Sequence, residues 1–210
     1  QLINALRGHL AEYGWVAPRG VAQAAMLADL LDEDEMASSL PEPARAMLRV
    51  MTEMLGQLDH RITGLDKEIA RRAREDEVAR RLMTIPGIGP IAATAIVALA
   101  PQATTFRKGR DFAAWLGLAP LQHSTGGKQK LGRISKMGER TIRRLLIIGG
   151  SAVVRQATVR GAPAGSWLEG MLARKPRMLV SVALANKMAR IAWALMTKQE
   201  DYKAPVAVAA

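Results

Sequence analysis

The feature that most constrains the fold of this 210-residue chain is a run of apolar residues spaced alternately three and four positions apart. Its members are Leu48, Met51, Leu55, Leu58, Ile62, Leu65 and Ile69. This spacing places them on one stripe of a helix, as in the a/d seam of a coiled coil. Gly56 and Gly64 each weaken such a helix by about 1 kcal/mol relative to alanine. The pattern predicts a long helix that pairs protomers into a dimer or tetramer. The alternative is a helix that folds back on its own domain.

The rest of the chain also predicts helices rather than strands. Apolar residues at helical spacing predict a first helix that ends at Gly14, a loop over 15–24 and a short helix through Met26 and Leu31. Gly149 and Gly150 would permit close contact between helices. No alternating pattern is long enough to build a sheet, so we expect a mainly α fold. The later predicted helices span about 91–99, 112–118, 142–154 and 177–196. The chain as a whole is predicted to divide into a helical segment at 1–43, a coiled-coil helix at 44–80, a compact helical domain at 81–200 and a disordered tail at 201–210.

The net charge of +11 is concentrated in the second part of the chain. Residues 1–80 carry 10 Lys and Arg against 14 Asp and Glu, whereas residues 81–210 carry 20 against 5, a net charge of +15. So little acid among so many cations predicts a polyanionic partner, and nucleic acid is the favoured one. Only four Trp, two Tyr and two Phe are present, which argues against an aromatic stacking platform for single strands.

Composition excludes several other classes of protein. Cysteine is absent, and His9, His60 and His123 are not at metal-ligand spacing, so we expect no thiolate or histidine metal site. The apolar runs are too short or too interrupted to suggest a membrane protein, and no secretion signal opens the chain. The chain begins with glutamine inside a helical pattern and looks truncated. We expect a cytoplasmic, nucleoid-associated protein without a membrane partner.

A glycine-rich turn opens the basic region. Residues 84–90 read TIPGIGP and precede the apolar helix expected at 91–99. Gly87 and Gly89 resemble the hairpin of a helix-hairpin-helix module, in which glycines let backbone amides approach a phosphate at a helix N-terminus. The alternative is a tight turn between helices that binds no ligand.

The segment from Gly117 to Arg144 combines hydroxyls, glycines and cations. Ser124, Thr125 and Ser135 supply the hydroxyls, and Glu139 is the one acid. A hydroxyl in such a loop is a phosphate ligand or a nucleophile assisted by cations, and the residues alone favour the simple ligand because serine is weak without a base. His123 is the nearby candidate base. The predicted phosphate contacts are Lys128, Lys130, Arg133, Lys136, Arg140, Arg143 and Arg144.

These motifs together resemble one family. IPGIGP, a helix and then GLAPLQHSTGGKQKLGRISKMGERTIRRLL are similar to the C-terminal domain of a group of bacterial insertion-sequence transposases. The resemblance covers nearly the whole chain and implies a preceding RuvC-like domain whose DEDD carboxylates bind Mg²⁺, followed by a coiled coil. It further implies a serine–phosphate link to DNA and, in characterised members, a guide RNA. The DEDD domain is missing from this chain, so Mg²⁺ is expected only through that domain and no cofactor is expected on the chain itself.

The resemblance also implies which residues carry the chemistry. The family's serine usually stands immediately before the first glycine of the loop, where this chain has Thr125. Ser124 lies one residue earlier and is the preferred nucleophile because the threonine side chain is restricted at χ1. Thr125 is the second choice and Ser135 the third. Without the carboxylate domain, we expect the chain to bind nucleic acid and self-associate but not to complete recombination.

Two other classes of function compete with this interpretation. A non-catalytic helix-hairpin-helix DNA-binding module, as in repair or junction-processing proteins, would use Gly87 and Gly89 but leaves the HSTGGK segment without a role. A structural coiled-coil adaptor would use the heptads but leaves the charge of +15 on residues 81–210 unused. The transposase fragment accounts for all three features.

Overall fold

The computed structural model describes residues 1–16 and 39–204 of the chain. Most of the loop predicted over 15–24, and the short helix predicted through Met26 and Leu31, lie outside these residues, as do residues 205–210. The chain divides into two compact units, Gln1–Glu68 and Ile69–Ala210. We describe each unit by itself.

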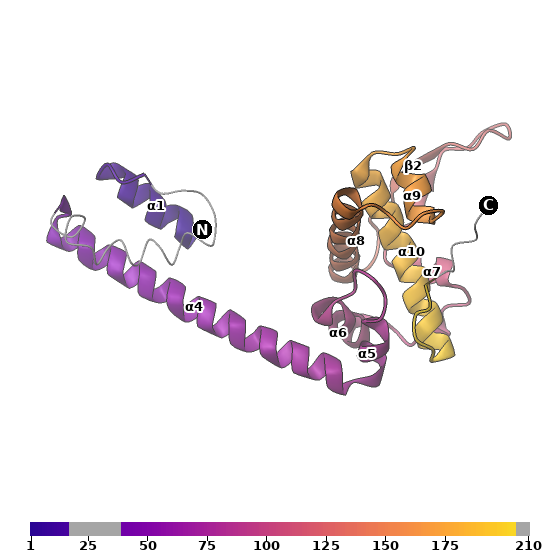
Figure 1. Ribbon diagram of the computed structural model, residues 1–210, viewed down its shortest axis with the longest axis horizontal. Helices are drawn as coiled ribbons and strands as arrows, with labels where there is room; N and C mark the ends of the chain where they lie inside the picture. Colours follow the sequence, from indigo (N-terminus) through magenta and orange to yellow (C-terminus); the bar gives the residue numbers. More distant parts are fainter. Residues whose placement is uncertain (17–38, 205–210) are drawn as a thin grey trace. The chain divides into compact units, whose positions relative to one another are not determined.

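The N-terminal unit contains helix α1 (Leu2–Glu12) and most of helix α4 (Glu42–Glu75) (Figure 1). Its core joins Leu6 and Leu10 of α1 to Leu48 of α4 and to Leu40, which precedes α4. All four side chains are buried. The indole Nε1 of Trp15 donates a hydrogen bond to the Ser39 hydroxyl at 3.0 Å, which ties the end of α1 to the segment before α4.

The predicted long helix is confirmed as α4, and its apolar seam has two different environments. At the N-terminal end, Leu48 is buried, and Met51 and Leu55 pack against the small core around α1. Farther along, the side chains of Leu58, Ile62 and Leu65 are 48%, 55% and 62% exposed. The first half of the seam therefore folds back on its own unit. Pairing between protomers stays a prediction that concerns the second half.

The C-terminal unit is helical apart from one small hairpin, so the mainly α prediction is confirmed. A two-stranded antiparallel sheet, which the sequence pattern did not predict, interrupts the helices. The elements after α4 are α5 (Glu77–Leu82), α6 (Pro90–Leu99), the 3₁₀ turn η1 (Ala103–Thr105), α7 (Gly109–Trp115), β1 (Pro120–Gln122), β2 (Leu131–Ile134), α8 (Arg140–Arg160), α9 (Trp167–Leu172) and α10 (Arg177–Lys198).

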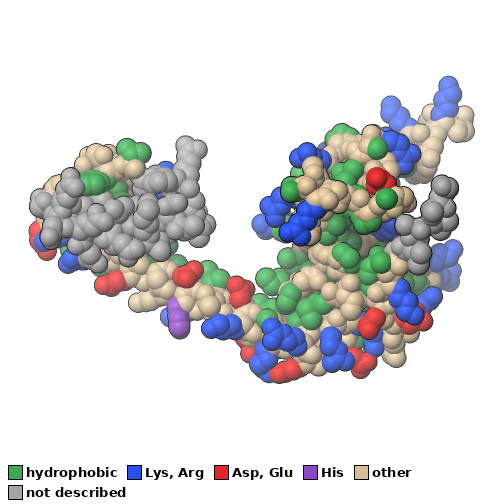
Figure 2. Space-filling view, in the orientation of Figure 1, with side chains coloured by type: hydrophobic (Ala, Val, Ile, Leu, Met, Phe, Trp, Pro, Cys, Tyr) green, Lys and Arg blue, Asp and Glu red, His purple; other side chains and the backbone are tan. Residues whose placement is uncertain are grey.

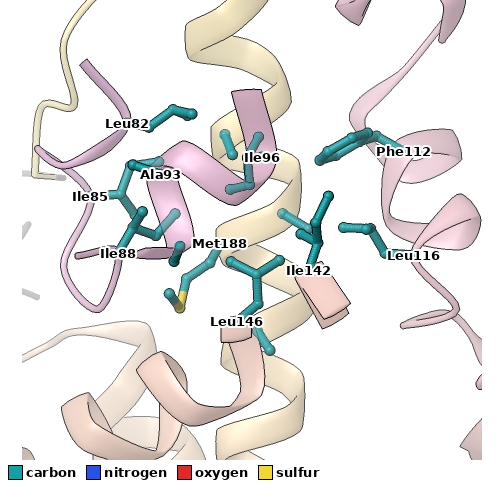
Figure 3. Close-up of a cluster of buried hydrophobic side chains, with 14 of the residues drawn as sticks. Leu82, Ile85, Ile88, Ala93, Ile96, Phe112, Leu116, Ile142, Leu146 and Met188 are labelled. Carbon is teal, nitrogen blue, oxygen red and sulfur yellow. The ribbon is translucent and has the colours of Figure 1, made fainter. Parts of the chain in front are cut away.

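Helix α10 lies at the centre of this unit and packs against α8 and α7 (Figure 1). Figure 3 shows buried side chains from the turn before α6, from α6 and α8 and from the region of α7, which form one cluster with Met188 of α10. Among the described helices, α10 is the one long and apolar enough to cross a membrane by length and composition. Its buried residues, among them Val180, Ala185 and Ala192, belong to the packed interior of this unit, which is the environment of a core helix.

Two adjacent glycines in α8 allow close backbone contacts, as the sequence predicted. A Cβ atom built on Gly150 would lie 2.8 Å from the carbonyl oxygen of Ser181 in α10. A Cβ atom on Gly149 would lie 1.9 Å from the carbonyl oxygen of Gly87. Real Cβ atoms do not approach oxygen so closely, so both positions need glycine.

The start of the predicted tail is held against the core. The backbone amide of Tyr202 donates to the Thr84 hydroxyl at 2.9 Å, and the partly buried Tyr202 side chain packs against the same core. Tyr202, the second residue of the predicted tail, thus contacts the core, and the disorder predicted for 201–210 stays a prediction.

Candidate functional site

The Ser124–Thr125 segment lies at the tip of the hairpin formed by β1 and β2. Gln122 pairs with Leu131, and an isolated bridge joins Thr125 to Lys128. The turn between them consists of Gly126 and Gly127, whose φ angles are +55° and +77°. Positive φ at both central residues is the requirement of a type I′ turn, which suits the twist of a hairpin. The two glycines therefore close the hairpin.

The hairpin carries its side chains in solvent. Every residue from 121 to 133 is exposed, and the hairpin projects from the helices of its unit (Figure 1). No Asp or Glu occurs between 112 and 138, so the cations of the segment have no acidic neighbour along the chain. Figure 2 shows that Lys and Arg side chains predominate over Asp and Glu on the visible face of the C-terminal unit. This surface is suited to contact with a polyanion.

Ser124 is held by two hydrogen bonds, one across the hairpin and one to a residue on its own side. Its hydroxyl accepts a hydrogen bond from the backbone amide of Lys130 at 3.0 Å and lies 3.2 Å from Oε1 of Gln122, to which it donates. The Thr125 hydroxyl makes no hydrogen bond to another residue in the part of the chain that the structure describes. The Ser124 oxygen is therefore held in one position, whereas the Thr125 hydroxyl has no such restraint.

His123 does not contact Ser124 as a base would. Its backbone amide donates to the carbonyl oxygen of Lys130 at 2.9 Å. Its ring lies against Gly132, where a Cβ atom would come within 2.8 Å of Nε2. No hydrogen bond joins His123 to Ser124 among the described residues. The neighbourhood of Ser124 thus holds it in place without a side-chain base to take its proton.

A β-bulge shapes the base of the hairpin. Pro120 pairs with Ile134 and Gln122 with Leu131, so two residues of β2, Gly132 and Arg133, stand opposite Leu121. A bulge bends its strand and redirects side chains. Here the bulge separates the regular hairpin tip from the strand ends next to the helices.

The third predicted nucleophile, Ser135, lies at the base of the hairpin, away from the tip. Its backbone amide donates to the carbonyl oxygen of Ala119 at 2.9 Å, and the Lys136 amide donates to that of Gly117 at 3.0 Å. Ser135 is half-buried. The structure therefore does not bring Ser135 together with Ser124 and Thr125.

Arg143 differs from the other predicted phosphate ligands because it is buried. Its guanidinium Nη1 donates to the carbonyl oxygen of Leu116 at 2.8 Å, and the residue is 9% exposed. Arg143 thus satisfies a buried carbonyl near the end of α7, and its contact with phosphate stays a prediction. The exposed members of the predicted set are Lys128, Lys130, Arg133, Lys136, Arg140 and Arg144.

Glu139 caps the helix that carries Arg140 and Arg144. Its carboxylate accepts hydrogen bonds from the amides of Thr141 at 2.9 Å and Ile142 at 2.5 Å. Burial raises the pKa of this carboxyl, but the two amide hydrogen bonds and the nearby charge of Arg143 lower it by more. The net pKa lies below its usual value, so Glu139 is an anion at neutral pH and serves to begin α8.

The two glycines of the predicted helix-hairpin-helix turn have different surroundings. Gly87 has φ +90° and faces the backbone of Gly149 in α8. Gly89 is exposed at the N-cap of α6, with no atom within 4 Å of a built Cβ. The conformation of Gly87 therefore serves packing between the turn and α8. The binding of phosphate by this turn stays a prediction.

Sequence reasoning missed a second group of cations, which the fold brings together beside α10. They are Lys108, Arg110, Lys175, Lys187 and Arg190, and they share a groove with Arg133. These residues are spread over more than eighty positions of the sequence, so no local pattern marks them as a group. In the sequence, these residues were visible only as part of the positive charge of residues 81–210.

The described residues do not form a metal site. No group of three or more His, Asp or Glu side chains in ranges 1–16 and 39–204 is placed to hold a metal ion.

The family model and the similar proteins that match this chain all describe transposases. Residues 79–162 match the family described as Transposase IS116/IS110/IS902. A Pseudomonas aeruginosa protein named "Probable family 20 transposase" is 46% identical over 203 residues, which cover 96% of this chain and 60% of that protein. The transposase for insertion sequence element IS1328 of Yersinia enterocolitica is 36% identical over 93% of this chain and 57% of its own length.

A further relative extends the same relationship. The transposase for insertion sequence element IS1111A of Coxiella burnetii is 35% identical over 202 residues, which are 96% of this chain and 55% of that protein. The chain thus spans little more than half the length of these relatives. Residues 79–162, which contain the end of α5, all of α6 to α8 and the whole hairpin, match the Transposase IS116/IS110/IS902 family, and the chain is similar over most of its length to transposases of insertion sequences.

Proposed function

We propose that this chain is the DNA-binding C-terminal part of an insertion-sequence transposase that acts in DNA transposition. The observation that carries the proposal is the pair of hydroxyls, Ser124 and Thr125, at the exposed tip of a hairpin that also bears Lys128 and Lys130. A hydroxyl that reaches a phosphodiester needs an exposed position, and the charge that develops on the phosphate needs nearby cations. The tip of this hairpin meets both needs.

The proposed reaction is attack by the Ser124 oxygen on the phosphorus of a DNA phosphodiester. The new bond joins Oγ to phosphorus, the bond from phosphorus to a 3′ or 5′ oxygen breaks, and the departing oxygen takes up a proton to become a hydroxyl. The hydroxyl proton of Ser124 passes to a base, and no side-chain base among the described residues forms a hydrogen bond with that hydroxyl. Rejoining would be the reverse attack by another DNA hydroxyl on the serine ester.

The hydrogen bonds of the hairpin favour Ser124 over Thr125 as the nucleophile. The Lys130 amide and the Gln122 side chain hold the Ser124 oxygen, and an oriented nucleophile loses less freedom when it attacks. The same bonds occupy one lone pair and the proton of the hydroxyl, so the hydrogen bond to Gln122 must break before a base can take the proton. Thr125 remains the second candidate because its hydroxyl has no such competitor.

The remaining partners of the protein belong to the same proposal. The carboxylates that bind Mg²⁺ would lie in a RuvC-like domain outside this chain. A guide RNA would select the DNA, and pairing through α4 would give a dimer or tetramer. We further propose a cytoplasmic location with association to the nucleoid. On its own, the chain would bind DNA without completing recombination.

The test of the reaction is formation of a covalent protein–DNA adduct by the chain joined to a RuvC-like domain. We expect an adduct on DNA that carries the element's end, and its loss in Ser124→Ala. Thr125→Ala tests the second candidate. Ser135→Ala is the matched control, because it removes a hydroxyl at the base of the hairpin and should leave the adduct unchanged. Adduct formation at the parental rate by the Ser124→Ala/Thr125→Ala double variant would overturn the assignment.

One observation supports the non-catalytic helix-hairpin-helix alternative. Gly89 is exposed at the N-cap of α6, where backbone amides at the helix start are suited to an anion. If the protein were only such a module, Gly89→Glu would abolish DNA binding and no adduct would form under any condition. Formation of the adduct by the chain with its carboxylate domain would exclude this alternative.

A further inference from the structure

A large groove in the described part of the chain lies beside α10, apart from the hairpin tip. It has a volume of about 1520 Å³. Its walls come from the first turn of α7, the base of the hairpin, the start of α9 and one side of α10. All these elements belong to the C-terminal unit, so the groove is complete within it.

The polar lining of the groove is strongly cationic. It includes the six basic residues Lys108, Arg110, Arg133, Lys175, Lys187 and Arg190 and no Asp or Glu. None of the six forms a salt bridge with another described residue. Burial lowers the pKa of Lys187, and the charge of Arg190 lowers it further. Cations are thus crowded together without a counter-charge, and a bound polyanion would relieve their repulsion.

The floor of the same groove is apolar. It is built from residues such as Leu118, Ile134 and Val182, and from two of the four tryptophans, Trp167 and Trp193. The indole of Trp167 is 38% exposed, and Nζ of Lys187 lies 4.6 Å from its ring centroid. The ammonium group of Lys187 therefore lies over one face of the indole, and both residues line the groove.

This combination distinguishes between forms of nucleic acid. A duplex stacks its bases inside and offers mainly phosphates, so an apolar floor adds little to its binding. A single strand offers phosphates and unpaired base faces together, and proteins bind it with cationic grooves that contain aromatic side chains. The small number of aromatic residues argued against such a site, but the fold places two of the four tryptophans, Trp167 and Trp193, in the lining of one groove.

We propose that the groove beside α10 binds a single-stranded segment of nucleic acid. The six cations contact the phosphates, and the bases lie on the apolar floor next to Trp167. The inference rests on the proposed function, since it assumes that the chain acts on nucleic acid. It adds a site that is distinct from the hairpin tip and that prefers single strands to duplex.

The test compares single strands with duplex by fluorescence anisotropy of the whole chain. The probes are labelled 12-nucleotide oligo(dT), oligo(U) and a 20-base-pair DNA duplex. The groove variant is the double substitution Lys175→Ala/Arg190→Ala. The matched control is Lys128→Ala/Lys130→Ala, which removes the same charge from the hairpin tip. The two single-stranded probes show whether DNA or RNA is the preferred occupant.

We expect the groove variant to weaken single-strand binding about tenfold and to reduce its salt slope by about 1.4, the value for two lost phosphate contacts. Duplex binding should change much less. Trp167→Ala should weaken binding of the single strands about five- to hundredfold through the loss of one stacked base. The hairpin control should show the opposite preference and weaken mainly duplex binding.

Three outcomes separate the failure of this inference from that of the proposed function. If no probe binds, the proposed function itself fails. If duplex binds but single-strand binding is unchanged in both groove variants, the groove inference is overturned. If a 12-residue poly-glutamate peptide binds in the groove more tightly than either single strand, the occupant is an acidic protein segment and the inference is again overturned.

Discussion

Gly87 and Gly149 meet backbone to backbone, so closely that a Cβ atom on Gly149 would lie 1.9 Å from the carbonyl oxygen of Gly87. The contact joins the glycine-rich turn before α6 to the middle of α8. The turn resembles a helix-hairpin-helix motif, in which glycines let the backbone approach a phosphate. The contact with Gly149 gives Gly87 a structural reason to be glycine that does not depend on phosphate binding.

Gly149→Ala should lower the free energy of unfolding by at least about 1–3 kcal/mol, the usual cost of forcing extra atoms into a packed interior. Chemical denaturation followed by circular dichroism measures the change. Gly56→Ala is the control, because Gly56 in α4 has no atom within 4 Å of a built Cβ. That substitution should raise helix stability by about 1 kcal/mol. Equal effects of the two substitutions would contradict the contact.

DNA binding should depend steeply on salt. If four to six of the exposed cations near the hairpin contact phosphates, the logarithm of the binding constant should fall against the logarithm of salt concentration with a slope of about −4 to −5 for duplex DNA. Titrations between about 50 and 200 mM salt measure the slope. A flat response would remove the electrostatic basis of the proposed function.

Leu58→Asp should dissociate the protein if the exposed half of the α4 seam pairs protomers. The substitution would bury a charge in the paired seam, which is costly when the charge has no partner. Gln57→Asp adds the same charge at the neighbouring exposed position and should leave the assembly intact. Light scattering at micromolar concentration measures the oligomer, and a monomeric parental chain would count against pairing.

Glu139→Gln should destabilise the start of α8 by about 1 kcal/mol at neutral pH, since one of the two carboxylate acceptors is lost. The pKa of Glu139 is lower in the folded protein than its usual value of about 4.5. Its contribution to stability is therefore present above that value and is lost as pH falls through the lowered pKa. The variant should lose this part of the acid dependence of thermal unfolding. Glu53→Gln, at an exposed position of α4, should retain it.

The sequence predicted the helices well where apolar periodicity was long. The seam from Leu48 to Ile69 is one continuous helix, and Gly149 and Gly150 make the close contacts expected of them. The hairpin was missed because strand patterns are recognised by alternation of buried and exposed residues, and both strands are exposed almost throughout. The Gly126-Gly127 pair was the one local signal of a turn of this type.

The site was predicted residue by residue but not in three dimensions. Sequence reasoning grouped Arg143 with Arg144 because both are cations in a basic run, yet one is buried and the other exposed. Their adjacent positions on a helix differ by about 100°, so α8 turns Arg143 toward the Leu116 carbonyl and Arg144 toward solvent. The cations of the groove beside α10 were not predicted as a group, because they are far apart in the sequence. Only tertiary folding brings Lys108 and Lys187 into one groove.

The regular pairing at the hairpin tip also determines how far the Ser124 hydroxyl reaches and which way it faces. Side chains alternate between the two faces of a strand, so adding one residue to each strand would turn the hydroxyl to the opposite face. Adding two residues to each would move it outward by about 7 Å with its facing unchanged. The length of this hairpin can thus be changed in steps of two residues per strand without turning the Ser124 hydroxyl to the other face. It sets the distance between the oxygen proposed as the nucleophile and the helices that support the hairpin.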